Sequence, residues 1–181
     1  MANQSVRRLA RLLGVPERTL RRAATDGLLH GRRLSERRYE TTLREELYLR
    51  EHWPLLRSLR AALRTEPNVR LAVLFGSVAA GRESEHSDID LLVTLRDSSA
   101  AAVAALAQRL SDRTGRDVQL VQLGEAERSP LLMADALAQG RVLIDRDRTW
   151  PRLKSAERRW QRKATAADVP LVDAMPDLGQ S

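Results

Sequence analysis

Two aspartates, Asp88 and Asp90, open an apolar segment, and ten residues separate them from an earlier Gly-Ser pair, Gly76 and Ser77. Alternate residues of a β-strand face the same way, so we expect both carboxylates on one side of a strand. Adjacent carboxylates repel each other unless a cation lies between them. Mg²⁺ prefers oxygen ligands and usually binds together with substrate phosphates, so this pair predicts a Mg²⁺ site.

The segments on either side have the composition of two strands joined by a short polar stretch. Residues 69–75, VRLAVLF, end at Gly76, and residues 88–95, DIDLLVTL, follow. Glycine would let the backbone approach a triphosphate, and Ser77 would offer its N–H and hydroxyl at the start of a short helix. Arg82 is a candidate for charge compensation at the phosphates. Alone, a Gly-Ser pair is a common turn and an Asp pair can lie on an exposed strand edge, but together at this spacing they favour a nucleotide site.

The order strand, Gly-Ser, short helix and strand opening with Asp-x-Asp resembles the nucleotidyltransferase superfamily that includes DNA polymerase β. It is most similar to the minimal nucleotidyltransferase (MNT) branch, over about residues 69–148. The resemblance implies metal-dependent transfer of a nucleoside monophosphate from an NTP to a protein or RNA hydroxyl. Related MNT proteins are antitoxins that nucleotidylate a HEPN-type toxin, so it also implies such a partner. The implied site residues are Asp88 and Asp90 for catalysis and metal binding, and Gly76, Ser77 and Arg82 for the nucleotide.

Members of this superfamily usually carry a third carboxylate on a later strand. In the expected strand 117–123, DVQLVQL, that position is Gln119, which cannot accept a proton at working pH. Asp117 lies two residues earlier on the same face, about 6.6 Å along the strand. Either Asp117 acts as the third catalytic carboxylate, or it only begins the strand. The alternative function is therefore a catalytically impaired DNA-binding regulator whose transferase-like domain senses nucleotide or binds a partner toxin.

The N-terminal segment predicts two short helices, over residues 5–13 and 17–24, with a turn at Gly14. The sequence ARLLGVPERTLRRA resembles the helix-turn-helix of bacterial regulators in a winged or MerR-like form, and implies double-stranded DNA as a partner. The alternative is a helical hairpin whose arginine face is solvated or contacts protein. The expected DNA-binding residues are Arg18, Thr19, Arg21 and Arg22 on the second helix, and Arg32, Arg33, Arg37 and Arg38 in the wing.

The charge distribution separates two regions of the 181-residue chain. Residues 1–68 hold 15 Arg and 8 acidic residues, whereas residues 69–150 hold 10 Arg and 12 acidic residues. All but two of the 31 basic residues are arginines, which bind phosphates and guanine edges bidentately. A basic N-terminal region beside a mildly acidic one indicates two tasks in one chain.

We therefore expect an α/β (α+β) protein with a small mixed sheet, flanking helices and an all-α helix-turn-helix domain before it. A helix over 98–114, a helix over 129–140 and a strand over 141–144 complete the transferase domain. The last helix is expected over about 150–163. The expected segments are 1–42, DNA-binding; 43–66, a linking helix bent near Pro54; 67–148, nucleotidyltransferase; 149–165, C-terminal helix; and 166–181, a flexible tail.

Several classes of protein are excluded by composition. The chain has no cysteine, so it has neither disulfides nor thiolate chemistry, and it has no Gly-x-x-x-x-Gly-Lys segment typical of P-loop ATPases. No stretch approaches the roughly 20 apolar residues of a membrane span, and the first apolar segment lacks a signal-peptide core, so we expect a cytoplasmic protein. A palindromic DNA site would require a homodimer.

Overall fold

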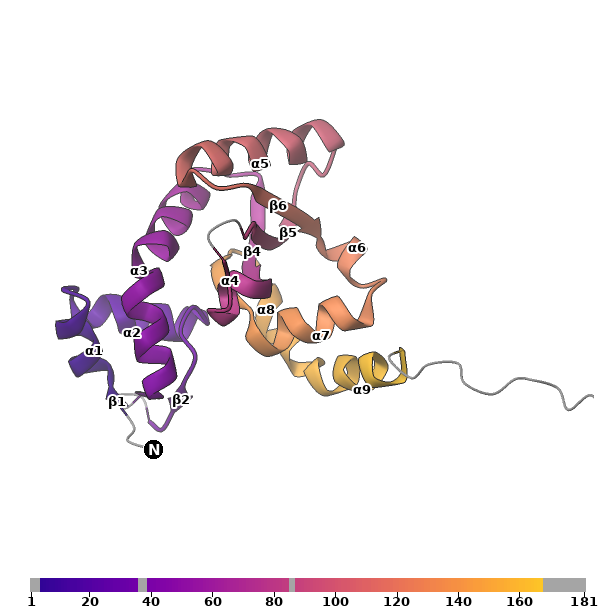
Figure 1. Cartoon of the computed structure of the whole chain (residues 1–181). Helices are drawn as coiled ribbons and strands as arrows, with labels where there is room; N and C mark the ends of the chain where they lie inside the picture. Colours follow the sequence, from indigo (N-terminus) through magenta and orange to yellow (C-terminus); the bar gives the residue numbers. More distant parts are fainter. Residues whose placement is uncertain (1–3, 36–38, 85–86, 168–181) are drawn as a thin grey trace, which may run out of the picture.

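A mixed four-stranded sheet lies at the centre of the molecule (Figure 1). The computed structural model describes residues 4–35, 39–84 and 87–167. The strands of this sheet are β4 (Val69–Phe75), β5 (Ile89–Leu95), β6 (Val118–Gln122) and β7 (Arg141–Asp145). Their order is β6-β5-β4-β7; β4 runs antiparallel to β5 and β7, and β5 runs parallel to β6. The expected mixed sheet is confirmed.

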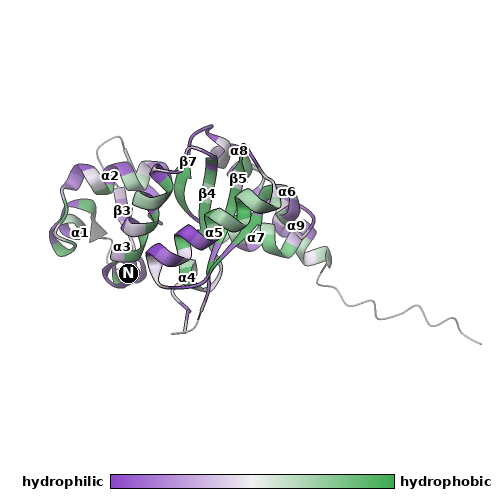
Figure 2. Ribbon diagram, turned by 90° about the horizontal axis from the view of Figure 1, so that it is seen from above, coloured by the Kyte–Doolittle hydropathy of each residue, from purple (hydrophilic) through white to green (hydrophobic). Residues whose placement is uncertain are grey.

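Helices cover both faces of this sheet, because its strands are apolar on both sides (Figure 2). One face packs on α5 and on the earlier helix α3, and the other packs on α7, α8 and α9. Ser99 begins α5 by accepting a hydrogen bond from the backbone N–H of Ala102, and Ser129 caps α7 in the same way. The helices after β4 are α4 (Gly76–Ala80), α5 (Ala100–Thr114), α6 (Leu123–Ala126), α7 (Pro130–Gln139), α8 (Thr149–Ser155) and α9 (Glu157–Ala167).

The N-terminal unit is not all-α as expected, because two short helices and a long helix are joined by a small antiparallel sheet. Gly14, at φ +63°, makes the turn after the first helix, and Gly27, at φ +86°, ends the second. Thr42 caps the long helix by accepting a hydrogen bond from the N–H of Glu45. The elements are β1 (Gln4–Ser5), α1 (Val6–Leu12), α2 (Glu17–Asp26), β2 (Arg32–Arg33), β3 (Tyr39–Thr41) and α3 (Leu43–Arg64), and the small sheet has the order β1-β3-β2.

The N-terminal unit and the large sheet share one hydrophobic core. Leu9 and Leu20 from the first two helices belong to the same buried cluster as Leu56 of α3 and Leu91 of β5. The N–H of Val142 in β7 also donates a hydrogen bond to the carbonyl of Gly27. The N-terminal helices are therefore packed onto the transferase-like part of the chain.

The structure corrects two expectations about the second half of the chain. The last helix was expected to be continuous, but Ala156 separates α8 from α9. The strand expected to reach Leu123 ends at Gln122, because Leu123 begins the short helix α6. Arg37, Arg38 and most of the expected tail lie outside the described residues. Within the described ranges, no helix has the length and apolar character needed to cross a bilayer.

Candidate functional site

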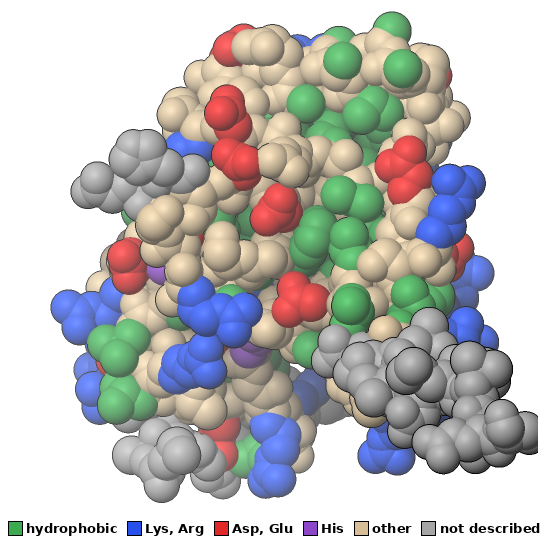
Figure 3. Space-filling model, turned by 45° about the vertical axis from the view of Figure 1, so that its right-hand side comes forward, with side chains coloured by type: hydrophobic (Ala, Val, Ile, Leu, Met, Phe, Trp, Pro, Cys, Tyr) green, Lys and Arg blue, Asp and Glu red, His purple; other side chains and the backbone are tan. Residues whose placement is uncertain are grey.

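Asp88 and Asp90 lie at the start of β5, which is an internal strand of the large sheet. Ile89 and Leu91 are fully buried, as the alternation predicts, while both aspartates remain half-buried. Their position therefore excludes the alternative of an exposed strand edge. Figure 3 shows acidic side chains gathered toward the middle of one face, with most of the Lys and Arg along its sides.

Gly76 brings the end of β4 against the Asp90 carboxylate. Phe75 is the register partner of Asp90, so the chain leaves β4 directly beside the start of β5. Gly76 has a φ of +73°, and a Cβ at this position would lie 2.5 Å from Oδ2 of Asp90. Only glycine suits both the left-handed backbone and this close approach. Ser77, half-buried in α4, is thereby held next to the aspartate pair.

The electrostatics of the site are those of crowded carboxylates. Burial raises the pKa of Asp90, and the negative charges of Asp88 and Asp135 raise that pKa further. Asp135 is on α7 and accepts a hydrogen bond of 3.0 Å from Gln139. Sequence reasoning missed Asp135, because nothing in the local sequence of α7 indicates that its charge acts on Asp90. A cation would relieve this repulsion.

Gln119 lies beside the aspartate pair, at the position expected for the third carboxylate of the superfamily. In the parallel pairing of β5 and β6, Gln119 is the register partner of Asp90. Its side-chain amide donates a hydrogen bond to the carboxylate of Asp88. One oxygen of the expected metal ligand is thus bound to an amide N–H.

Asp117 precedes β6 and has an exposed side chain. Its backbone carbonyl accepts a hydrogen bond of 2.8 Å from the N–H of Ile89. Its side chain and that of Asp88 line the same cavity, of about 610 Å³, together with Arg116 and Asp112. Asp117 is therefore close to the start of β5 without replacing Gln119 in the strand register.

A divalent cation is compatible with this donor set. Among the described residues, no cluster of three or more His, Asp or Glu side chains has the arrangement of a metal centre. Mg²⁺, however, is commonly bound through one or two carboxylates, with substrate phosphates and waters as its other ligands. Asp88 and Asp90 supply two such carboxylates. They would hold the ion only together with the phosphates of a nucleotide.

Arg82 is not brought to the cavity beside Asp88. It is exposed and lines a second cavity, of about 290 Å³, that also includes Glu45 and Arg141. The buried Arg141 guanidinium donates hydrogen bonds of 2.7 and 2.9 Å to Glu45 and lies 3.5 Å from the ring centre of Tyr48. This buried pair links β7 to α3 and was not expected from the sequence.

The arginines expected to contact DNA differ in their exposure and in their ion pairs. Arg18, Thr19 and Arg22 have exposed side chains on α2, whereas Arg21 forms an ion pair of 2.5 Å with Glu17 on the same helix. Arg32 and Arg33 are exposed on β2, which pairs with β3 in the position expected for a wing.

Comparison with known protein families gives one decisive match. The family model described as polymerase beta, nucleotidyltransferase, matches residues 57–149. The chain belongs to this nucleotidyltransferase family. The matched region begins within α3, contains the Gly-Ser pair and both aspartates, and ends at the start of α8. It does not include the N-terminal helices α1 and α2.

Several solved structures similar to the chain come from toxin–antitoxin complexes. A chain of a toxin–antitoxin complex crystallised with AMP-PNP matches with a TM-score of 0.51 and 28% identity, over 62% of this chain and 90% of its own. A chain of the MntA–HpeT toxin–antitoxin complex, in a mutant with two aspartates two positions apart changed to glutamate, matches with a TM-score of 0.51 and 26% identity, over the same shares. A search of curated proteins gives no match.

Proposed function

We propose that this protein is a metal-dependent nucleotidyltransferase that moves a nucleoside monophosphate from an NTP to a hydroxyl of a partner protein or RNA. The observation that carries the proposal is the convergence of Asp88 and Asp90 with the backbone at Gly76, where Oδ2 of Asp90 lies too close for any Cβ. A site for a metal-bound triphosphate needs two carboxylates for the metal and a backbone that comes close to the phosphates, and a glycine beside the carboxylates allows this approach.

The residues divide the work according to their chemistry. Asp88 and Asp90 would hold Mg²⁺, which would neutralise charge on the phosphates and on the leaving pyrophosphate. The backbone at Gly76 and the hydroxyl of Ser77 would position the triphosphate, so that the acceptor oxygen attacks the α-phosphorus and the bond to the β-phosphate oxygen breaks. Asp117, in the cavity beside Asp88, is the candidate to take the proton of the acceptor hydroxyl.

The partner we propose is a HEPN-type toxin, which would make this protein an antitoxin. Two lines support this proposal. The similar chains at TM-scores of 0.51 belong to toxin–antitoxin complexes, and one of these complexes was crystallised with an ATP analogue. In the other, the mutated aspartates have the same spacing as Asp88 and Asp90.

The test is transfer of label from ATP carrying ³²P at the α-phosphate, with Mg²⁺, to a purified HEPN-type partner. We expect labelled partner and released pyrophosphate from the unaltered protein, and no label when the ³²P is at the γ-phosphate. Asp88→Asn/Asp90→Asn should remove the label, and Glu127→Gln, an exposed acidic residue on another surface, should keep it. Equal labelling by the double variant would refute the assignment.

A second function is favoured by one observation, the hydrogen bond from Gln119 to Asp88. Gln119 replaces the third carboxylate with a neutral amide, and this amide also donates a hydrogen bond to the remaining carboxylate of Asp88. The domain would then bind nucleotide or a toxin without turnover. The chain would then be a DNA-binding regulator. Calorimetry with ATP separates the two functions, because Mg²⁺-dependent binding supports the transferase, and binding without metal dependence supports the regulator.

We propose that residues 1–42 form a DNA-binding domain of the helix-turn-helix type, which would target the protein or autoregulate its expression. Two helices with a glycine turn, followed by a hairpin with exposed arginines, support this assignment. An Arg18→Ala/Arg22→Ala/Arg32→Ala variant should lose most retardation of duplex fragments, and binding by the unaltered protein should weaken steeply with salt. Arg113→Ala, exposed on α5, is the control. Unchanged retardation by the triple variant would contradict the assignment.

A further inference from the structure

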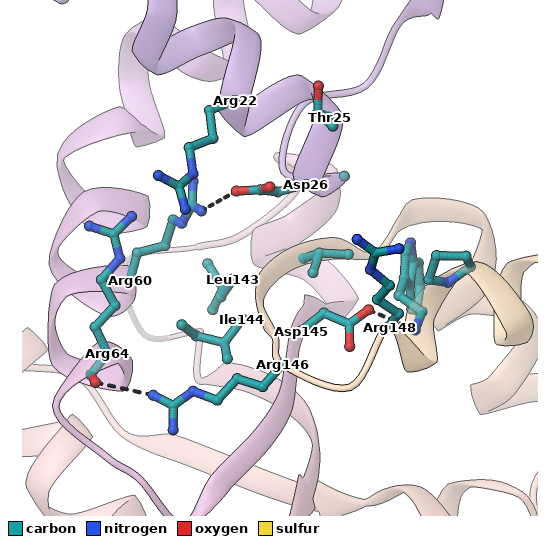
Figure 4. Close-up of a pocket in the computed structure, with 14 residues that line it drawn as sticks. Arg22, Thr25, Asp26, Arg60, Arg64, Leu143, Ile144, Asp145, Arg146 and Arg148 are labelled. Carbon is teal, nitrogen blue, oxygen red and sulfur yellow. Dashed lines mark hydrogen bonds and ion pairs between the residues drawn. The ribbon is translucent and has the colours of Figure 1, made fainter.

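A cavity of about 540 Å³ lies between the N-terminal unit and the transferase domain, away from the aspartate pair. Its walls come from α2, α3 and the segment that joins β7 to α8, and Leu143 and Ile144 lie at its base (Figure 4). Asp145, at the end of β7, pairs with Leu71 near the start of β4, whereas Gly76 follows the opposite end of β4. The cavity and the aspartate pair are therefore near opposite ends of one strand.

The lining of this cavity is strongly positive. Its arginines are Arg22, Arg60, Arg64, Arg146 and Arg148. Asp26 and Asp145 are its two carboxylates among the described residues. Both oxygens of Asp145 accept hydrogen bonds of 2.9 Å from the backbone N–H groups of Thr149 and Trp150. Asp26 is bound to Arg60 at 2.6 Å. Neither carboxylate forms an ion pair with the other arginines within the described part of the chain, and five guanidinium groups against two carboxylates leave the lining with a net positive charge.

Three of these arginines have side chains without a hydrogen bond or ion pair among the described residues. Arg146 donates to the backbone carbonyls at the end of α3, which fixes its position. In contrast, the side chains of Arg22, Arg64 and Arg148 form no hydrogen bond or ion pair with any described part of the chain. In Figure 4, the side chains of Arg22, Arg60 and Arg64 lie one above another along one wall. Arg60 adds a buried Nε that has no partner among the described residues.

The backbone at Arg148 is held in an unfavourable conformation. Its φ is +53° and its ψ is +39°, which makes it the sole non-glycine residue with positive φ in the described chain. A side chain with a Cβ costs about 1–2 kcal/mol in this left-handed region, so a large residue is rarely placed there without a reason. This turn places Arg148 on the wall of the cavity.

We propose that this cavity binds a small oligophosphate, meaning inorganic polyphosphate or a nucleotide with at least two phosphates. Arg22, Arg64 and Arg148 would contact it, and Arg60, which is paired with Asp26, lies between Arg22 and Arg64. Guanidinium groups with free donors bind phosphate oxygens bidentately, and a cavity of this volume has the size of small-molecule sites. A concave site assembled from three distant segments fits a compact anion better than the extended backbone of a DNA duplex.

The position of the cavity gives such a ligand a structural consequence. Arg22 comes from α2, and Arg148 comes from the turn before α8, so one anion bound by both would tie the N-terminal unit to the transferase domain. Arg22 is also among the residues proposed to contact DNA. Oligophosphate binding would therefore compete with duplex binding for this side chain.

The experiment is calorimetry and thermal unfolding of the full chain with sodium tripolyphosphate in the presence of EDTA, at about 0.1 M salt. Without divalent metal, the aspartate pair does not contribute, so this result is independent of nucleotidyl transfer. We expect saturable binding and a concentration-dependent rise in Tm. Arg64→Ala/Arg148→Gly should weaken binding at least tenfold. Arg57→Ala, an exposed arginine of α3 outside the cavity, and Asp88→Asn/Asp90→Asn should bind as the unaltered protein does.

Two results would overturn the proposal: no saturable binding of tripolyphosphate, or equal binding by the double variant and the unaltered protein. The fold of the double variant is checked by its Tm without ligand, and Arg64→Gln alone provides a milder change with the same expected direction. Sodium sulfate at matched ionic strength controls for general screening. If the unaltered protein does not bind tripolyphosphate and the Arg64→Ala/Arg148→Gly variant no longer retards duplex DNA, the cavity binds DNA phosphates instead.

Discussion

The aspartate pair and the arginine cavity are electrostatic opposites near the two ends of β4. Each gathers like charges that repel one another, and each lacks enough opposite charge from the described chain to balance them. The aspartate pair is formed by one short segment, residues 76–90, whereas the arginine cavity draws on residues 22 to 148. In this protein, local sequence specifies the aspartate pair, whereas the arginine cavity exists only in the assembled fold.

In both regions we expect single substitutions to reduce function, and removal of one of the repelling charges to raise the free energy of unfolding. The following predictions test this symmetry, from the largest effect to the smallest.

Gly76→Ala should have the largest effect. Its Cβ would collide with Oδ2 of Asp90, and φ is +73°, so we expect nucleotidyl transfer to fall at least a hundredfold and stability to fall by about 1–3 kcal/mol. The measurements are the α-³²P transfer assay and chemical denaturation. Gly124→Ala is the matched control, since nothing lies within 4 Å of its added Cβ. A Gly76→Ala protein with normal transfer would separate this glycine from the site.

Gln119→Asp should raise transfer by about tenfold or more, because it supplies a third carboxylate and releases Asp88 from the amide hydrogen bond. The metal-free variant should also be less stable, since another negative charge joins the cluster. Steady-state transfer rates and thermal unfolding test both effects. The control is Gln122→Asp, on the same strand but not at the register position of Asp90. Unchanged transfer would show that Gln119 does not limit the reaction.

Asp90→Asn should stabilise the metal-free protein at neutral pH while it abolishes transfer. The folded state raises the pKa of Asp90 through burial and the charge of Asp88, so ionisation of this carboxyl costs stability. The cost is present above the folded pKa and disappears as pH falls below the ordinary value of 3.8. Because water still reaches the carboxyl, we expect a gain below about 1 kcal/mol. Melting curves from pH 3.5 to 7.5 should show the variant's advantage only at the higher pH values.

Arg148→Gly should have the smallest effect on stability, between neutral and about 1 kcal/mol stabilising. Glycine relieves the left-handed backbone and removes one repelling charge, but it also adds freedom to the unfolded chain. Denaturation with and without tripolyphosphate measures the effect. Arg152→Gly, within α8, should instead destabilise by about 1 kcal/mol. A clear loss of stability in Arg148→Gly would show that this guanidinium supports the fold.

Much of the fold was predictable because its signals are local. The apolar runs of β4 and β5, the alternation of Ile89 and Leu91 with the aspartates, and the serine caps of α5 and α7 each depend on neighbours in sequence. The break at Ala156 was not predicted, because the sequence around it has no glycine or proline to end a helix; Trp150 before it and Trp160 after it both pack into the core on the same face of the sheet.

By itself, the sequence determined the chemistry of the aspartate pair, since strand alternation and a glycine corner act over a few residues. Only the tertiary structure decided that the charge of Asp135 raises the pKa of Asp90, that Gln119 binds Asp88, and that Arg82 lies in another cavity. It also decided that Arg22, Arg64 and Arg148 line one cavity. The physical reason is range: backbone preferences fix neighbouring residues, whereas charges from distant segments meet only when burial of the common core brings their elements together.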